Sequence, residues 1–161
     1  MRPRWLILLG LLLLLQACGF QLRGFVSLPD HLSNLQLLAN NLTTNQQRTL
    51  SQRLEKAGAT LHRDDAENVL KLRVSIKSLP ERKLADSAGS GQNIVRLSRR
   101  LSFSLIEASG NRLASNKTIE QNIDLELDEA NLLGTEGEKQ QALDNLDTAL
   151  FNSLMIQLRR L

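Results

Sequence analysis

The sequence predicts an α+β fold, a two-layer sandwich with two helices packed on one face of a four-stranded mixed sheet. Three long segments alternate apolar and polar residues, as strands with one buried face do. Two other segments repeat leucines at helical spacing and must bury that stripe. These segments follow one another as strand, helix, three strands, helix. The simplest arrangement leaves the second face of the sheet polar and open.

The first strand and the first helix lie between residues 34 and 58. The segment 34–41 has a short apolar centre and polar ends, which predicts a brief strand. Thr44 begins the helix, because Gln47 three residues later completes a capping box. Gly58 offers a left-handed stop at the other end. The apolar residues of the helix repeat at helical spacing: Leu50, Leu54 and Ala57.

Three alternating segments follow, 69–79, 95–105 and 118–127, and each predicts a strand with one apolar face. Arg99 is a charged residue in the otherwise apolar face of the second of them. A long polar loop is expected from Pro80 to Gln92, since small and polar residues dominate there.

The turn between the last two strands sets their register. A three-residue loop of residues 109–111 places apolar residues opposite apolar ones, whereas a two-residue loop would place them opposite polar ones. The three-residue loop aligns Arg100 with Glu120 and Arg96 with Asp124, so opposite charges meet across the two strands.

The last element is a helix with one leucine stripe. Thr135 and Glu138 predict its capping box. The stripe is formed by Leu143, Leu146, Leu150, Leu154, Leu158 and Leu161.

The N-terminus resembles the signal of a bacterial lipoprotein. Arg2 and Arg4 precede an apolar run from Leu6 to Leu15, which is shorter than the roughly 20 residues of a membrane-spanning helix. Residues 15–18 (Leu-Gln-Ala-Cys) resemble a lipobox and contain the only cysteine, Cys18. The resemblance implies cleavage before Cys18 and lipid attachment to its thiol. The alternative is a signal that happens to end near a buried cysteine.

The chain therefore divides into three expected parts: a signal peptide (1–17), a lipidated tether (18–34) and a single α+β domain (35–161). Loss of the signal lowers the formal net charge from +3 to about +1. This near-neutral charge and the absence of tyrosine give no support to nucleic-acid binding.

Residues for catalysis or metal binding are scarce. His31 and His62 are the only histidines, and neither belongs to a metal-ligand pattern. The acidic cluster within residues 63–67 suits a solvated turn between a helix and a strand. No nucleophile elbow, P-loop or dinucleotide fingerprint is present. We therefore expect a protein that is not an enzyme and uses no metal or cofactor.

The stretch Cys18-Gly19-Phe20-Gln21-Leu22-Arg23-Gly24 resembles the start of the LptE family, the lipopolysaccharide-assembly lipoproteins of Gram-negative outer membranes. The element order and the C-terminal helix extend the likeness over most of the chain. The resemblance implies a non-enzymatic plug inside the LptD barrel that helps the barrel assemble and binds lipopolysaccharide. Gly19 in place of aspartate implies anchoring to the outer membrane, on its periplasmic face.

Basic residues gather on the polar faces of two predicted strands, and we call this set the basic strip: Lys71, Arg73, Lys77, Arg96 and Arg100. Such a strip can bind the phosphates of lipopolysaccharide. The resemblance to the LptE family implies that bases near the tip of the sheet, which some family members use, take part in this binding. The segment 86–92 has none here, so the nearest bases are Arg82, Lys83 and Arg96.

Other readings remain open. The basic strip suits a merely solvated face equally well. The chain also suits a lipoprotein that scaffolds another envelope machine or contacts peptidoglycan. An envelope hydrolase is a third class, which the scarcity of catalytic residues disfavours.

Overall fold

The structure is a computed structural model that describes residues 27–63, 69–86, 92–128 and 132–161. The predicted signal peptide, Cys18 and most of the predicted tether lie outside these residues. The elements follow in this order: η1 (Asp30–Leu32), β1 (Asn34–Asn40), α2 (Thr44–Lys56), β2 (Thr60–His62), β3 (Leu70–Ser78), β4 (Arg82–Asp86), β5 (Gln92–Ile106), β6 (Arg112–Asp128) and α3 (Leu132–Leu158).

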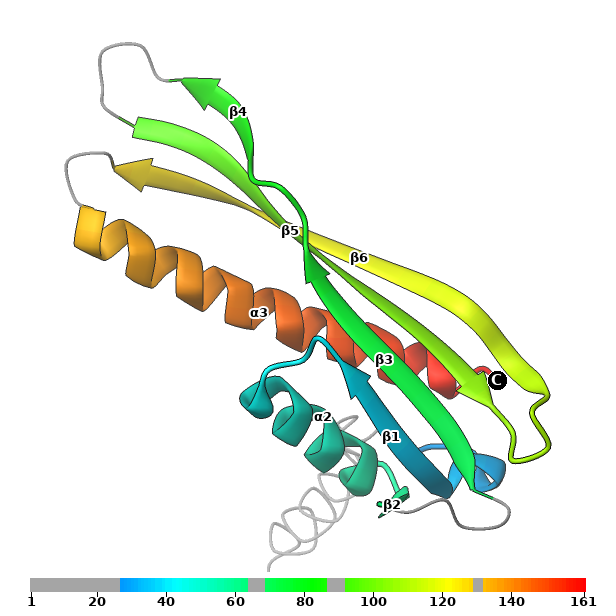
Figure 1. Ribbon diagram of the computed structural model, residues 1–161. Coiled ribbons are helices and arrows are strands. Elements are labelled where there is room, and N and C mark those ends of the chain that lie inside the picture. Colours follow the sequence, from blue (N-terminus) through cyan, green and yellow to red (C-terminus); the bar gives the residue numbers. More distant parts are fainter. Residues whose placement is uncertain (1–26, 64–68, 87–91, 129–131) are drawn as a thin grey trace, which may run out of the picture.

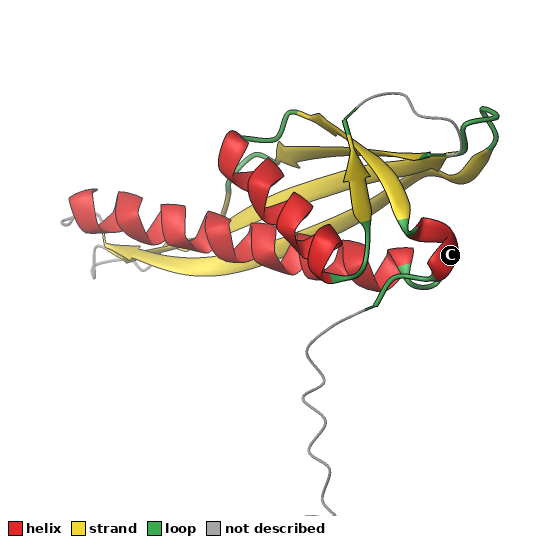
Figure 2. Ribbon diagram, turned by 90° about the horizontal axis from the view of Figure 1, so that it is seen from below, coloured by secondary structure: helices red, strands yellow, loops and turns green. Residues whose placement is uncertain are grey.

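The predicted fold class is confirmed. Figure 1 shows one long twisted sheet, and Figure 2 shows both helices on the same side of it. β1 pairs in parallel with β2 and β3, whereas β5 pairs antiparallel with β3, β4 and β6. The sheet is therefore mixed, as expected.

The sheet has six strands rather than four. The two additional strands are β2, which has three residues, and β4, which has five. β4 lies inside the segment predicted as a long polar loop, so that prediction is wrong. Segments this short contain too few alternations to be separated from loops by their pattern.

The main core lies between the sheet and the two helices. Leu50 of α2 and Leu150 of α3 are fully buried in one cluster with Leu72 of β3 and Leu101 of β5. The predicted stripes thus face the sheet. A smaller cluster around Leu146 continues the core under the far half of β5.

The predicted register of the long hairpin is confirmed, since Arg96 lies opposite Asp124 and Arg100 opposite Glu120. The turn is longer than predicted. The strands end at Ile106 and resume at Arg112, because two register shifts near the turn each place one extra residue on β6. The two bulges together shift the pairing by two residues, so even-numbered residues again lie opposite even-numbered ones at the turn.

α2 begins at Thr44 as predicted, but its cap differs from the prediction, and so does the start of α3. Thr43, not Thr44, caps α2: its hydroxyl accepts from the Gln46 N–H at 3.3 Å, and the Gln46 side chain accepts from the Thr43 N–H at 2.7 Å. Adjacent threonines made either residue a reasonable cap. α3 begins at Leu132, so Thr135 lies inside the helix instead of capping it.

The folded domain begins before residue 35. The Leu28 N–H donates to the Ala57 carbonyl at 2.9 Å, and Leu32 is 0% exposed. The predicted tether is therefore too long at its C-terminal end, because its last apolar residues complete the core. Across the described ranges, no helix combines the length and apolar character needed to cross a membrane.

Candidate functional site

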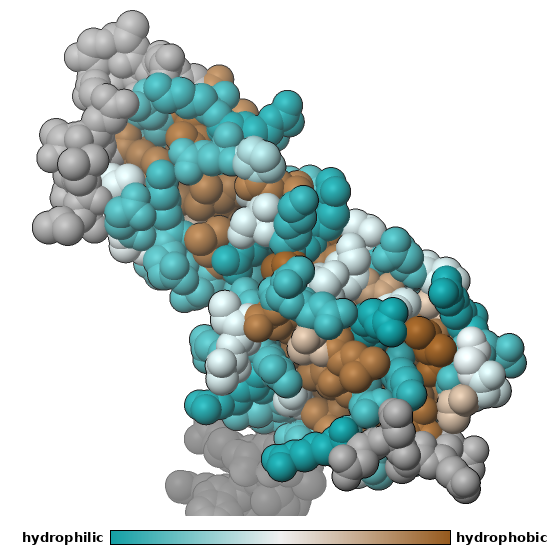
Figure 3. All heavy atoms as spheres, in the orientation of Figure 1, coloured by the Kyte–Doolittle hydropathy of each residue, from teal (hydrophilic) through white to brown (hydrophobic). Residues whose placement is uncertain are grey.

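The sheet has one face that the helices do not cover. In Figure 1 β3 crosses in front of α3, so Figure 3 shows the part of this open face that lies over β3. Hydrophilic side chains alternate there with hydrophobic patches. Alternation along β5 explains the difference between the faces. Leu97 and Leu101 are buried toward the helices, whereas Arg96 and Arg100 extend from the opposite face.

Two rows of charged residues cross the open face. In one row Lys77 of β3 lies opposite Arg100 of β5, which lies opposite Glu120 of β6. In the other row Arg82 of β4 lies opposite Arg96, which lies opposite Asp124. Each row therefore holds two bases and one acid.

The acids of β6 pair with the arginines of β5. Arg96 donates from Nε and Nη2 to the two carboxylate oxygens of Asp124, at 2.6 and 2.8 Å. Arg100 donates from the same two nitrogens to one oxygen of Glu120, at 3.2 and 2.9 Å. The hydrogen bond from Arg96 lowers the pKa of Asp124, and the same bond raises the pKa of Arg96. Both pairs are exposed, so they orient the arginines more than they stabilise the fold.

In each row the base next to the arginine of β5 forms no ion pair with a described acid. Within the described ranges, neither Lys77 nor Arg82 has a carboxylate within 4.0 Å. Like charges that face each other across a ladder repel, so both rows carry uncompensated positive charge. An anion bound beside these two bases would relieve that repulsion.

The rows meet at a depression of about 380 Å³, which we call the arginine hollow. Its lining consists of Leu79, Pro80, Arg82, Arg96, Ser98, Arg100, Glu120 and Asn122. It forms where β3 gives way to β4. The Leu79 N–H still donates to the Ser98 carbonyl at 2.9 Å, but Pro80 has no N–H and cannot continue the ladder.

The structure separates the predicted site residues into groups. Arg82, Arg96 and Arg100 line the arginine hollow, and Lys77 lies in the row beside it. Arg73 and Lys71 lie on the same face but about 13 and 20 Å farther along β3, from the rise per residue. Lys83 lies opposite Val95, which is buried toward the helices, so Lys83 does not belong to this face.

Arg82 was predicted only as one of the bases nearest the 86–92 segment, because its residues were expected to form a loop. The signal that could have placed it is the parity of the hairpin: Arg82 pairs with Arg96 only if a second strand continues β3 past Pro80. The alternation of β5 begins only at Val95, because Asn93 and Ile94 reverse it, so the pattern of β5 gives no sign of this partner.

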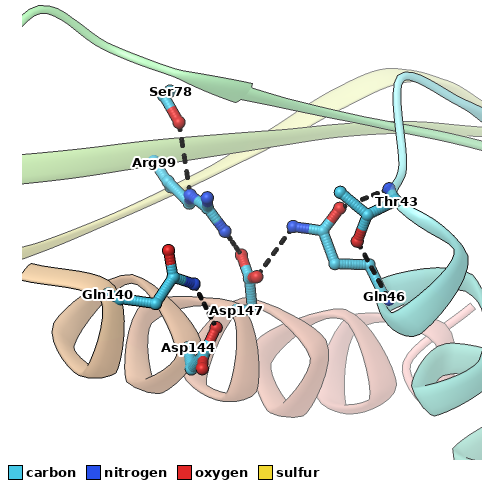
Figure 4. A network of polar contacts seen from close by, with 7 residues as sticks. All are labelled: Thr43, Gln46, Ser78, Arg99, Gln140, Asp144 and Asp147. Carbon is cyan, nitrogen blue, oxygen red and sulfur yellow. Dashed lines mark hydrogen bonds and ion pairs between the residues drawn. The ribbon is translucent and has the colours of Figure 1, made fainter. Parts of the chain in front are cut away.

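A second polar site lies under the opposite face. Arg99 of β5 points toward the helices, forms an ion pair with Asp147 of α3, and donates to the Ser78 hydroxyl at 3.3 Å. Gln46 of α2 donates to the other oxygen of Asp147 at 2.7 Å. Figure 4 shows this network between the sheet and both helices. Arg99 stood out in the sequence as a charge on an apolar face, but Asp147 was not predicted as its partner. This acid interrupts the leucine stripe four residues after Leu143.

The two histidines line separate depressions. In the described segments no group of three histidine, cysteine, aspartate or glutamate side chains could hold a metal. The Nε2 atom of His62 lies 3.1 Å from Oδ1 of Asn34. The exposed His31 lines a separate depression with Glu107.

Solved structures of three bacterial lipoproteins are similar to this chain. Lipoprotein B from Nitrosomonas europaea has a TM-score of 0.65 and 21% identity, covering 88% of each chain. Rare lipoprotein B from Shewanella oneidensis has a TM-score of 0.64 and 18% identity, covering 77% of this chain and 91% of that one. A minor lipoprotein from Acinetobacter baumannii has a TM-score of 0.63 and 17% identity, covering 80% and 94%.

No protein-family model matches the sequence, and no curated protein gives a significant match. Identities this low show a common fold only, so the roles of the site residues rest on the geometry of this chain. The chain shares its α+β fold with these three bacterial lipoproteins.

Proposed function

We propose that this chain is a non-enzymatic lipoprotein, anchored to the periplasmic face of the outer membrane. In this proposal it plugs and helps assemble an LptD-type barrel and binds lipopolysaccharide for delivery to the outer leaflet. Three observations support it: the lipobox at Cys18, the resemblance of residues 18–24 to the LptE family, and the fold shared with bacterial lipoproteins.

The arginine hollow is the observation that carries the binding part of the proposal. Lipid A is a phosphorylated lipid, and guanidinium groups match phosphate oxygens with two parallel hydrogen bonds. Lys77 and Arg82 supply positive charge that no described carboxylate neutralises. Arg96 and Arg100 are already held in place by Asp124 and Glu120. The lining also includes Leu79 and Pro80, which suit an amphipathic ligand.

Two matched double variants test this site. Lys77→Glu with Arg82→Glu reverses one base that lines the hollow and one in the row beside it. Lys71→Glu with Arg73→Glu makes the same charge change on the same face, farther along β3. Because one charge-assisted hydrogen bond contributes roughly 1.5–3 kcal/mol, the first variant should weaken lipopolysaccharide binding at least tenfold, with the control changing it much less. Equal loss in both variants would show that the sheet attracts lipopolysaccharide only through its general charge.

Dephosphorylated lipid A identifies the chemistry. It should bind the parent protein as weakly as the hollow variant binds the phosphorylated form. Binding should also decline with salt, because exposed charges are screened over about 10 Å at 0.1 M.

The barrel part of the proposal has its own test. Depletion of the chain in cells should lower the amount of correctly folded, heat-modifiable barrel. An unchanged barrel in depleted cells would argue against a plug. A fraction bound to the cell-wall sacculus would favour the alternative scaffold.

A further inference from the structure

One edge of the sheet is incompletely covered. β1 pairs with β3 along residues 35–40, but on its other side β2 covers only residues 34–36. From Leu37 to Asn40 no strand in the described part of the chain pairs with this outer edge. The segment contains no charged residue and no proline, which are the usual protections of an exposed edge.

The direction of the free backbone groups follows from one hydrogen bond. The Thr60 N–H donates to the Ser33 carbonyl at 2.6 Å, so the Ser33 carbonyl faces the β2 side. The backbone N–H and C=O groups of successive residues point to alternate sides of a strand. Those of Leu35, Leu37 and Ala39 therefore point to the same side as the Ser33 carbonyl. The ladder ends at the pair of Gln36 with His62. Beyond it, the Leu37 carbonyl and both backbone groups of Ala39 face outward without a strand partner among the described residues.

A cleft of about 570 Å³ lies along this edge. Leu37 and Leu38 of β1 form one wall. The other wall is one stripe of α2, where Gln47, Ser51 and Glu55 recur every four residues. Figure 1 shows α2 beside the free end of β1. A free strand edge beside a helix is the geometry in which an added strand can lie.

Gln36 points independently to a ligand. It lines the cleft and is 8% exposed. Its Nε2 donates to the Arg63 carbonyl at 3.3 Å, but its Oε1 is buried without a donor among the described residues. A buried acceptor without a partner costs roughly 1–3 kcal/mol. A donor from a bound group would remove that cost.

We propose that this edge and cleft bind an extended segment of a partner polypeptide as an additional strand of the sheet. The segment continues the line of β2, exchanges backbone hydrogen bonds with Leu37 and Ala39, and donates a side-chain hydrogen bond to Gln36. β2 is a precedent within the fold, since it already occupies the first half of the same edge as a strand. Only a polypeptide backbone presents donors and acceptors at the required spacing.

A second copy of this chain fits the edge poorly. If two β1 strands paired antiparallel through residues 37–39, each would extend into the position that β2 occupies on the other copy. Only about three residues could then pair, well below the length of an ordinary strand. The proposed strand site is also separate from the arginine hollow, which lies between other strands of the sheet. The inference therefore goes beyond the proposed function.

The test uses the full-length chain in detergent and a positional-scanning library of acetylated hexapeptides. Ala39→Pro removes the outward N–H, and it should leave the pairing with β3 intact because that N–H does not face β3. Ala39→Val is the matched control, because it adds side-chain bulk but keeps the N–H. Selected peptides should bind the parent and the valine variant alike. The proline variant should bind them about tenfold more weakly, as expected for the loss of one or two backbone hydrogen bonds.

Peptides methylated on alternate backbone nitrogens keep the inference falsifiable if the proline variant unfolds. Methylation in one register should abolish binding, and methylation in the other should preserve it. Binding should also slow hydrogen exchange at the Ala39 amide. The inference is overturned if no hexapeptide binds, if both methylated registers bind equally, or if the chain self-associates through this edge instead.

Discussion

The ion pair between Arg99 and Asp147 should be one of the strongest polar contributions to stability. The side chains are only 14% and 10% exposed, and Gln46 binds the second carboxylate oxygen. Asp147→Asn keeps the shape and a hydrogen-bonding oxygen but leaves the Arg99 charge without its partner. Breaking a buried pair in this way costs about 3–5 kcal/mol. Since both groups retain some contact with water, we expect a loss of about 3 kcal/mol, at the low end of that range.

Urea unfolding measures this loss. A typical slope of about 2 kcal/mol per molar urea converts 3 kcal/mol into a midpoint shift of roughly 1.5 M. The slope itself should stay constant, because the variant exposes no additional surface on unfolding.

The matched double variant separates pairing from packing. Arg99→Leu and Asp147→Leu should each cost about as much as Asp147→Asn, because each leaves one buried charge without its partner. Arg99→Leu with Asp147→Leu should lie close to the parent, since apolar residues can replace a buried pair at little cost. If the double variant instead loses the sum of the single losses, the residues act independently and the ion-pair argument is wrong. A single-variant loss below 1 kcal/mol would contradict it as well.

Three further changes test other parts of the chain. Cys18→Ser should accumulate as an uncleaved precursor that takes up no labelled palmitate, whereas normal processing of that variant would contradict the lipobox. Gly58→Ala should destabilise the domain by roughly 1–2 kcal/mol because φ is 98°, although a Cβ there meets nothing within 4 Å; an unchanged melting temperature would refute this cost. Asp124 has a lowered pKa through Arg96, so its pair stabilises the fold above the ordinary value of 3.8 and loses that effect as the pH falls through the lowered one. Asp124→Asn should therefore lose less stability than the parent as the pH falls, because it has no carboxylate to protonate at this position. Superimposable acid-unfolding curves for parent and variant would contradict the stabilising role of the Asp124–Arg96 pair.

The sequence predicted most of the strands and helices whose apolar residues follow a regular spacing. Residue parity alone aligned Arg96 with Asp124, because a strand that slips by one residue turns its apolar face to water. Leucine spacing likewise identified the buried faces of both helices. Long elements with many repeats contain enough information to be placed by pattern.

Elements that depend on tertiary contacts were less predictable. β4 is stable as a strand because it pairs with β5, and its own five residues show little alternation. The cap of α2 is Thr43 instead of Thr44, and Gln46 then serves both the cap and Asp147. The partner of Arg99 lies 48 positions away on α3. The only sequence signal that links the two is that each places a charged residue in an otherwise apolar stripe.

Arginines of one strand serve opposite purposes on the two faces of the sheet. Arg99 is enclosed by a helix and a strand, where its charge is matched by Asp147. Arg96 and Arg100 are exposed on the other face, where Arg82 and Lys77 add charge that no described acid matches. Changes at Arg99 should therefore alter stability and leave lipopolysaccharide affinity intact in the folded fraction. Changes at Arg82 or Lys77 should do the reverse, because relieving like-charge repulsion on an exposed sheet costs the fold nothing. A variant that lowered both properties together would show that the two faces are coupled through β5.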